Sequence, residues 1–154
     1  DLDGEKEIIF TTQYGNSGSL YAIRHDGTDV EGFPLDISEK MIAGPAVGDL
    51  EGDGSPDIVI VTWSDNLYVV DNIENIKEGF PIVSTERFSI SPILVDLDFD
   101  GDLEIITGND NGLLQILEHS GEEVTSYDVG DDIRGGLSIS DLDNNGSCRV
   151  SKNA

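Results

Sequence analysis

The chain has 154 residues, of which 37% are hydrophobic, so it is long and apolar enough to build an ordinary hydrophobic core. Its 32 acidic residues and 8 lysines and arginines give a formal net charge of -24. Such an acidic chain repels nucleic acid and anionic membrane surfaces, and its natural charged partners are cations. No stretch approaches the ~20 consecutive apolar residues of a transmembrane helix, and the single cysteine, Cys148, excludes an internal disulfide framework.

The most informative feature is an acidic phrase that recurs four times. Its copies begin at Asp1, Asp49, Asp96 and Asp141, and the first copy enters the phrase part-way. Their loop glycines lie 50, 47 and 45 residues apart, at Gly4, Gly54, Gly101 and Gly146. A period of this length is typical of a propeller blade.

The segments between the acidic loops also repeat, in the same order. An apolar run rich in β-branched residues follows each loop, at residues 8–12, 58–63 and 105–107. The second run covers residues 20–23, 67–70 and 113–117, and the third covers residues 32–35, 79–82 and 124–129. A fourth short strand leads into the next loop, at residues 45–48, 92–95 and 137–140. Four short strands per unit of about 47 residues predict an all-β chain of β-propeller blades.

The domain boundaries follow from this period. We expect a repeat array over residues 1–147 and an irregular tail over residues 148–154. The array divides into part of a blade (1–44), two blades (45–91 and 92–136) and the start of another (137–147). Propellers typically have about 4 to 8 blades, so about three four-stranded blade equivalents predict a larger propeller or a homo-oligomer. In the homo-oligomer, residues 137–140 of one copy would complete the first blade of another copy.

The acidic loops have the spacing of calcium ligands. Calcium takes about six to eight hard oxygen ligands, and alternate residues of a tightly curved loop aim side-chain oxygens inward. The two complete copies supply oxygens at positions 1, 3, 5, 7 and 9, with a backbone carbonyl at position 7. These predicted ligands are Asp49, Glu51, Asp53, Ser55 and Asp57 in the second copy, and Asp96, Asp98, Asp100, Asp102 and Glu104 in the third.

The first and fourth copies are less complete. The first copy lacks position 1, and its predicted ligands are Asp1, Asp3, Glu5 and Glu7. The fourth copy offers Asp141, Asp143 and Asn145, but Arg149 stands where the closing carboxylate belongs. We therefore expect Ca²⁺ as the cofactor and the fourth loop as the weakest site.

The acidic spacing is shared by two other kinds of loop. An EF-hand loop also begins with alternating carboxylates, but it needs a glutamate at position 12 and flanking helices. Position 12 here is Ile60 or Thr107, inside a β-branched run. The second alternative is an acidic turn solvated without metal. Four carboxylates within nine residues repel one another strongly unless a cation neutralises them, so the spacing favours calcium loops.

The array resembles the FG-GAP and VCBS repeats of integrin α-subunit propellers and bacterial surface proteins. Pro-Ala-Val-Gly-Asp-Leu-Glu-Gly-Asp-Gly at residues 45–54 carries the resemblance, together with Leu-Tyr-Ala-Ile at 20–23 and Gly-Phe-Pro-Leu at 32–35. The resemblance implies four-stranded blades with calcium between the first and second strands of each blade. It also implies a role in adhesion or as an accessory domain.

Nothing in the chain indicates a catalytic site. His25 and His119 are isolated residues near turns, and no Gly-x-Ser-x-Gly elbow appears. Trp63, Tyr21 and Tyr68 are expected in packing between strands rather than in a sugar-stacking platform. We expect a secreted, extracellular or cell-surface module that binds calcium and a protein or glycan partner.

The alternative function is a fragment of a propeller polysaccharide lyase or another secreted carbohydrate-active enzyme. In such an enzyme, similar calcium loops lie beside catalytic basic residues. Only 8 lysines and arginines are present, and they are scattered along the sequence. The non-catalytic module is therefore preferred.

Overall fold

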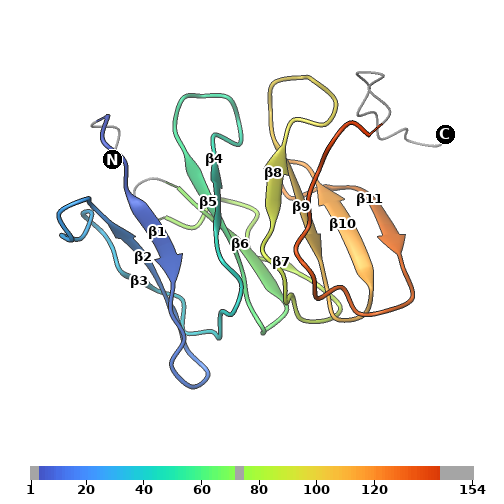
Figure 1. Cartoon of the computed structure of the whole chain (residues 1–154), viewed down its shortest axis with the longest axis horizontal. Coiled ribbons are helices and arrows are strands. Elements are labelled where there is room, and N and C mark those ends of the chain that lie inside the picture. Colours follow the sequence, from blue (N-terminus) through green and yellow to red (C-terminus); the bar gives the residue numbers. More distant parts are fainter. Residues whose placement is uncertain (1–3, 72–74, 143–154) are drawn as a thin grey trace.

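The computed structural model describes residues 4–71 and 75–142, which form three antiparallel sheets (Figure 1). The first sheet contains β1 (Ile8–Thr11), β2 (Ser19–Ile23) and β3 (Leu35–Asp36). The second contains β4 (Ala46–Gly48), β5 (Asp57–Val61), β6 (Asn66–Val70) and β7 (Ile82–Val83). The third contains β8 (Ile93–Val95), β9 (Glu104–Gly108), β10 (Leu113–Leu117) and β11 (Glu123–Asp128).

Each sheet consists of strands that are consecutive in the sequence, as the repeat predicts. The first strands of the two four-stranded sheets, β4 and β8, lie beside each other. The three sheets stand side by side and do not close into a ring (Figure 1). The all-β prediction is therefore confirmed. Within the described part of the chain, no helix has the length and hydrophobicity needed to cross a membrane.

The middle sheet is buried on both faces. Adjacent residues of a β-strand point to opposite faces of the sheet. All five residues of β5 are buried. Ile58 and Ile60 join the core that packs against β2 of the first sheet. Val59 and Val61 join the core that packs against β9 of the third sheet. The apolar run after the second acidic loop therefore anchors that loop to a strand that is buried on both faces.

Two strand predictions are wrong. Residues 137–140 form no strand. The corresponding strand β4 is held by pairing with β5, the strand after its loop. No described segment supplies such a partner for residues 137–140.

The third strands, β3 and β7, begin later than predicted. Gly32 and Gly79 both turn with φ of 92°, and the prolines that follow cannot donate a ladder hydrogen bond. Completion of the three-stranded first sheet by a second copy stays a prediction.

One carboxylate holds the segment between β3 and β4 to the middle sheet. Glu39 accepts hydrogen bonds from the Thr62 hydroxyl at 2.5 Å, the Asn66 amide at 2.9 Å and the Tyr68 hydroxyl at 2.8 Å. These three donors come from the β5–β6 hairpin. A carboxylate with several donors is a strong acceptor, so this contact ties the first sheet to the second.

The Tyr68 hydroxyl provides a test of this contact. Burial, together with the hydrogen bond to Glu39 and the charge of Glu39, raises the pKa of Tyr68 to about 12. The unfolded chain releases this proton near pH 10, so the contribution to folding is complete below that pH and is lost as the pH rises to about 12. Tyr68→Phe should therefore reduce the alkaline loss of stability, measured by denaturant unfolding from pH 8 to 12.

Tyr14→Phe, at a tyrosine that is 88% exposed, is the matched control. An alkaline unfolding profile of Tyr68→Phe that superimposes on the wild-type profile would contradict the assigned contact.

Candidate metal centre

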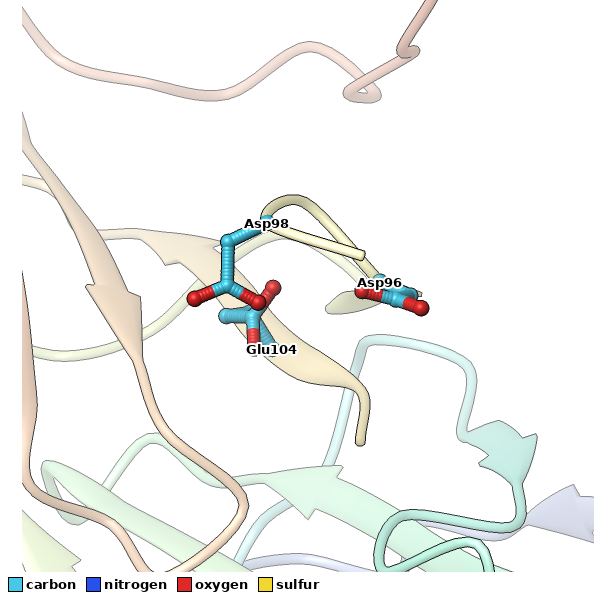
Figure 2. Close-up of side chains that lie close together, drawn as sticks. All are labelled: Asp96, Asp98 and Glu104. Carbon is cyan, nitrogen blue, oxygen red and sulfur yellow. The ribbon is translucent and has the colours of Figure 1, made fainter. Parts of the chain in front are cut away.

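The third acidic loop, residues 96–104, brings three carboxylates together. It connects β8 to β9 at the same end of the molecule as the second loop, residues 49–57 (Figure 1). Ligand atoms of Asp96, Asp98 and Glu104 lie within 4.8 Å of one another (Figure 2). Glu104 is only 4% exposed. Calcium prefers hard oxygen donors of this kind, so the three side chains fit such an ion.

The backbone of this loop turns around the Asp96 carboxylate. Asp96 accepts a hydrogen bond on each carboxylate oxygen, from the Phe99 amide at 2.6 Å and the Gly101 amide at 3.2 Å. The Asp102 amide donates to Asp100 Oδ1 at 3.0 Å. Gly101 has φ of 106°, a conformation that L side chains rarely adopt. The turn therefore requires the glycine at position 6.

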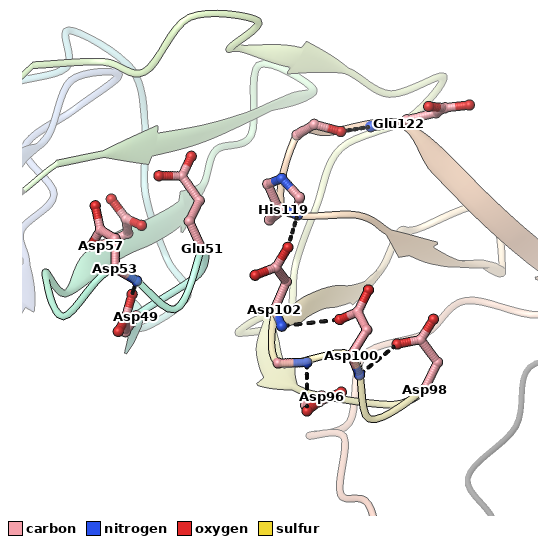
Figure 3. Close-up of polar contacts among 12 residues, drawn as sticks. Asp49, Glu51, Asp53, Asp57, Asp96, Asp98, Asp100, Asp102, His119 and Glu122 are labelled. Carbon is pink, nitrogen blue, oxygen red and sulfur yellow. Dashed lines mark hydrogen bonds and ion pairs between the residues drawn. The ribbon is translucent and has the colours of Figure 1, made fainter.

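The side chains of Asp100 and Asp102 lie outside the three-residue cluster. The prediction for Asp102 concerns its backbone carbonyl, which the position of its side chain does not test. Asp100 accepts a hydrogen bond from the Asp102 amide, and Asp102 Oδ2 lies 3.4 Å from His119 Nδ1 (Figure 3). That separation is within ion-pair range, although Nδ1 makes no hydrogen bond in this geometry. Sequence reasoning treated His119 as an isolated turn residue. Its approach to the loop depends on the pairing of β9 with β10 and carries no local sequence signal.

The surroundings of Glu104 disfavour its charged form. Burial raises the pKa of the Glu104 carboxyl, and the hydrogen bond from the Leu97 amide opposes that rise. The negative charges of Asp98, Glu118 and Asp100 raise the pKa further. A divalent ion among these carboxylates would reverse the repulsion.

The second loop has a similar backbone pattern. Asp49 Oδ1 accepts a hydrogen bond from the Asp53 amide at 3.0 Å, and Asp49 Oδ2 accepts one from the Gly54 amide at 2.8 Å. The Ser55 amide donates to Asp53 Oδ1 at 2.7 Å. Asp49 therefore organises this loop as Asp96 organises the third loop, which supports the alignment made from the repeat.

The side chains of the second loop meet a lysine. Lys77 Nζ lies 2.9 Å from Glu51 Oε1 and 3.2 Å from Asp57 Oδ2. Burial raises the pKa of Asp57, and the hydrogen bond and charge of Lys77 oppose this effect. Burial would lower the pKa of Lys77, but the two carboxylates outweigh it and raise that pKa. Sequence reasoning missed Lys77, because it is 20 residues from Asp57 along the chain.

The second and third loops touch each other. The Leu103 amide donates a hydrogen bond to the Leu50 carbonyl at 2.9 Å, and Figure 3 shows the two sets of carboxylates on neighbouring loops. A side chain added at Gly52 would approach the Gly101 carbonyl oxygen to 3.2 Å. The carboxylates of both loops therefore share one acidic region.

The outer copies of the loop are described only in part. Asp1 and Asp3 lie outside the described residues, as do Asp143 and Asn145. Glu5 and Asp141 are exposed. Glu7 stands at the closing position of the first copy, and its Oε1 atom is buried with no hydrogen-bond partner among the described residues. A buried carboxylate oxygen without a donor is costly, and calcium coordination would satisfy it.

Comparison with known proteins agrees with the repeat. The family model of the FG-GAP-like repeat matches residues 49–107, from the start of the second loop into β9. This part of the chain is therefore similar to an FG-GAP-like repeat. The matched segment contains both complete acidic loops, so the resemblance carried by these loops is confirmed for this part of the chain.

Solved structures support the fold around the FG-GAP-like repeat. The biofilm matrix protein Bap1 of V. cholerae matches 82% of this chain with a TM-score of 0.53 and 19% identity. BBS1N, crystallised in complex with ARL6DN and soaked with lead, also matches 82% with a TM-score of 0.53, at 13% identity. The matches cover 28% and 41% of those chains, so this chain spans less than half of either. A search of curated proteins found no match.

The carboxylate cluster gives a prediction whose sign depends on calcium. Asp98→Asn removes one charge from a repulsive group, so in chelator the variant should be at least as stable as the wild type. In excess calcium it should lose a ligand and be less stable than the wild type, by about 1 to 3 kcal/mol. Denaturant unfolding with and without calcium measures both values.

The control is Glu31→Gln, which removes one negative charge from an exposed turn between β2 and β3. The assignment of Asp98 fails if its substitution shifts stability equally in calcium and in chelator.

Proposed function

We propose that this chain is a calcium-stabilised β-propeller module that binds an extracellular protein or glycan and has no catalysis of its own. The observation that carries the proposal is the cluster of Asp96, Asp98 and Glu104. Its donors are all carboxylate oxygens, and its closing residue is buried at the start of β9. Calcium would supply positive charge there and fix the loop against the strand.

The placement of the basic residues argues against the lyase alternative. Lys40 Nζ lies 3.2 Å from the centroid of the Trp63 ring, and the Arg87 guanidinium lies 4.9 Å from it. Arg87 and Arg134 both contact Asp110. These three cations are less scattered than the sequence suggested, but each is engaged by side chains of its own chain. They therefore do not form a free basic cluster for the chemistry of an acidic sugar.

The family supports the same class of function. FG-GAP repeats are usually non-catalytic binding modules. The net charge of -24 favours an environment rich in divalent cations, and extracellular modules bind calcium at about 10⁻⁴ to 10⁻³ M. The negative charge and this range of calcium affinity together support a secreted or cell-surface location. The similarity to the biofilm matrix protein is a similarity of fold.

Calcium should raise the stability of the chain. An ion that binds only the folded state at about a hundredfold excess over its Kd adds roughly 2.7 kcal/mol per site, or about 5 to 10 °C in Tm. Differential scanning calorimetry in calcium, in magnesium and in chelator measures the effect. Magnesium should produce a smaller rise, because it demands octahedral geometry and dehydrates reluctantly. An unchanged Tm in millimolar calcium would refute the metal assignment.

The Asp98→Asn variant also tests the proposed binding of a partner. Calcium-loaded chain should bind members of a glycan array or a panel of extracellular proteins, and Asp98→Asn in calcium should bind them more weakly. Release of unsaturated sugars from acidic polysaccharides by the wild-type chain would instead support the lyase alternative.

A further inference from the structure

We infer that Lys77 is a built-in counter-ion of the second acidic loop, where it competes with calcium for Glu51 and Asp57. The second loop is then less dependent on calcium than the third loop. This inference rests on the proposed calcium binding and assigns a residue that controls it.

The contact places an ammonium group next to two of the predicted calcium ligands. Lys77 Nζ is 2.9 Å from Glu51 Oε1 and 3.2 Å from Asp57 Oδ2. These carboxylates occupy positions 3 and 9 of the loop, which correspond to Asp98 and Glu104 of the third loop. The Asp57 side chain is only 5% exposed, so it needs a cation partner in the folded state.

The backbone around Lys77 is held on both sides. Its amide donates to the Val69 carbonyl at 2.9 Å, and its carbonyl accepts from the Phe80 amide at 3.2 Å. In the first sheet the same backbone bond joins the Val30 amide to the Ala22 carbonyl at 2.9 Å. Val30 is a buried apolar residue. The lysine is therefore a feature of the middle repeat and not of the repeat pattern.

The third repeat contains no equivalent cation. The sequence has no lysine or arginine from residue 88 to residue 133. His119 approaches this loop, but it lies next to Asp102 and not next to the Asp98 and Glu104 carboxylates. The third loop therefore depends on an external ion, whereas the second loop carries its own positive charge.

An ammonium group and a calcium ion compete for these two carboxylates. Both are attracted to the same oxygens, and at this separation their positive charges repel. Calcium must displace Lys77 and break two charge-assisted hydrogen bonds. The affinity of the second loop for calcium is lowered by that competition, while its stability without calcium is raised.

The test is Lys77→Met, with calcium bound per chain counted by isothermal titration calorimetry and native mass spectrometry. Under conditions in which the wild-type second loop is largely empty, the variant should bind one more ion. Its affinity at this loop should rise by about tenfold or more. In chelator its Tm should fall below that of the wild type, and calcium should restore it.

Two further variants separate this effect from a general loss of charge. Lys77→Arg keeps the cation and should keep the wild-type calcium count. Lys40→Met removes one positive charge from the Trp63 ring and should also leave that count unchanged. An additional ion in Lys40→Met equal to that in Lys77→Met would overturn the competition.

The outcomes distinguish this inference from the proposed function. If the wild type binds calcium and Lys77→Met shows neither an added ion nor a lower Tm in chelator, the inference is wrong and the calcium function stands. If neither protein binds calcium, both are wrong.

A measurement on the wild-type chain covers the case in which Lys77→Met does not fold. ¹⁵N NMR of the lysine side chains should show the protected Lys77 ammonium in chelator, and saturating calcium should release it. A Lys77 signal that stays protected while the amides of residues 49–57 shift would overturn the inference.

Discussion

Repulsion among carboxylates at one end of the sheets is the constraint on which this structure depends. The first three acidic loops each end in a buried or partly buried carboxylate at or next to the start of a strand, namely Glu7, Asp57 or Glu104. Burial disfavours the charged form of such a group unless a cation or several donors accompany it. The structure shows Lys77 beside Asp57, a single backbone donor for Glu104 and an unpartnered oxygen on Glu7. Neutralisation of these carboxylates differs from loop to loop.

The core explains why the loops hold their carboxylates close together. The middle sheet is packed on both faces, so β5 cannot shift to move Asp57 away from Glu51. In the third sheet, all five residues of β9 are buried in the same way, and Glu104 is the first of them. The hydrophobic burial of these strands therefore holds the carboxylates together against their repulsion. A metal ion or a lysine reduces the free-energy cost of that repulsion.

Much of the fold and part of the site could be predicted from the sequence. The acidic phrase and the apolar runs recur with one period, so strands within residues 58–63 and 105–107 and the loops before them follow from the pattern alone. The contacts of Lys77 and His119 could not be predicted, because strand pairing brings them to loops far along the chain. Residues 137–140 have a strand-like sequence, but a strand also requires a partner that the described residues do not provide.

The most direct test of the account is a crystal structure of the chain grown in saturating calcium, with the ion identified by its anomalous scattering. The account predicts an ion bonded to oxygens of Asp96, Asp98 and Glu104 at about 2.3 to 2.6 Å. A well-ordered third loop without an ion under these conditions, with its carboxylates still grouped, would contradict it.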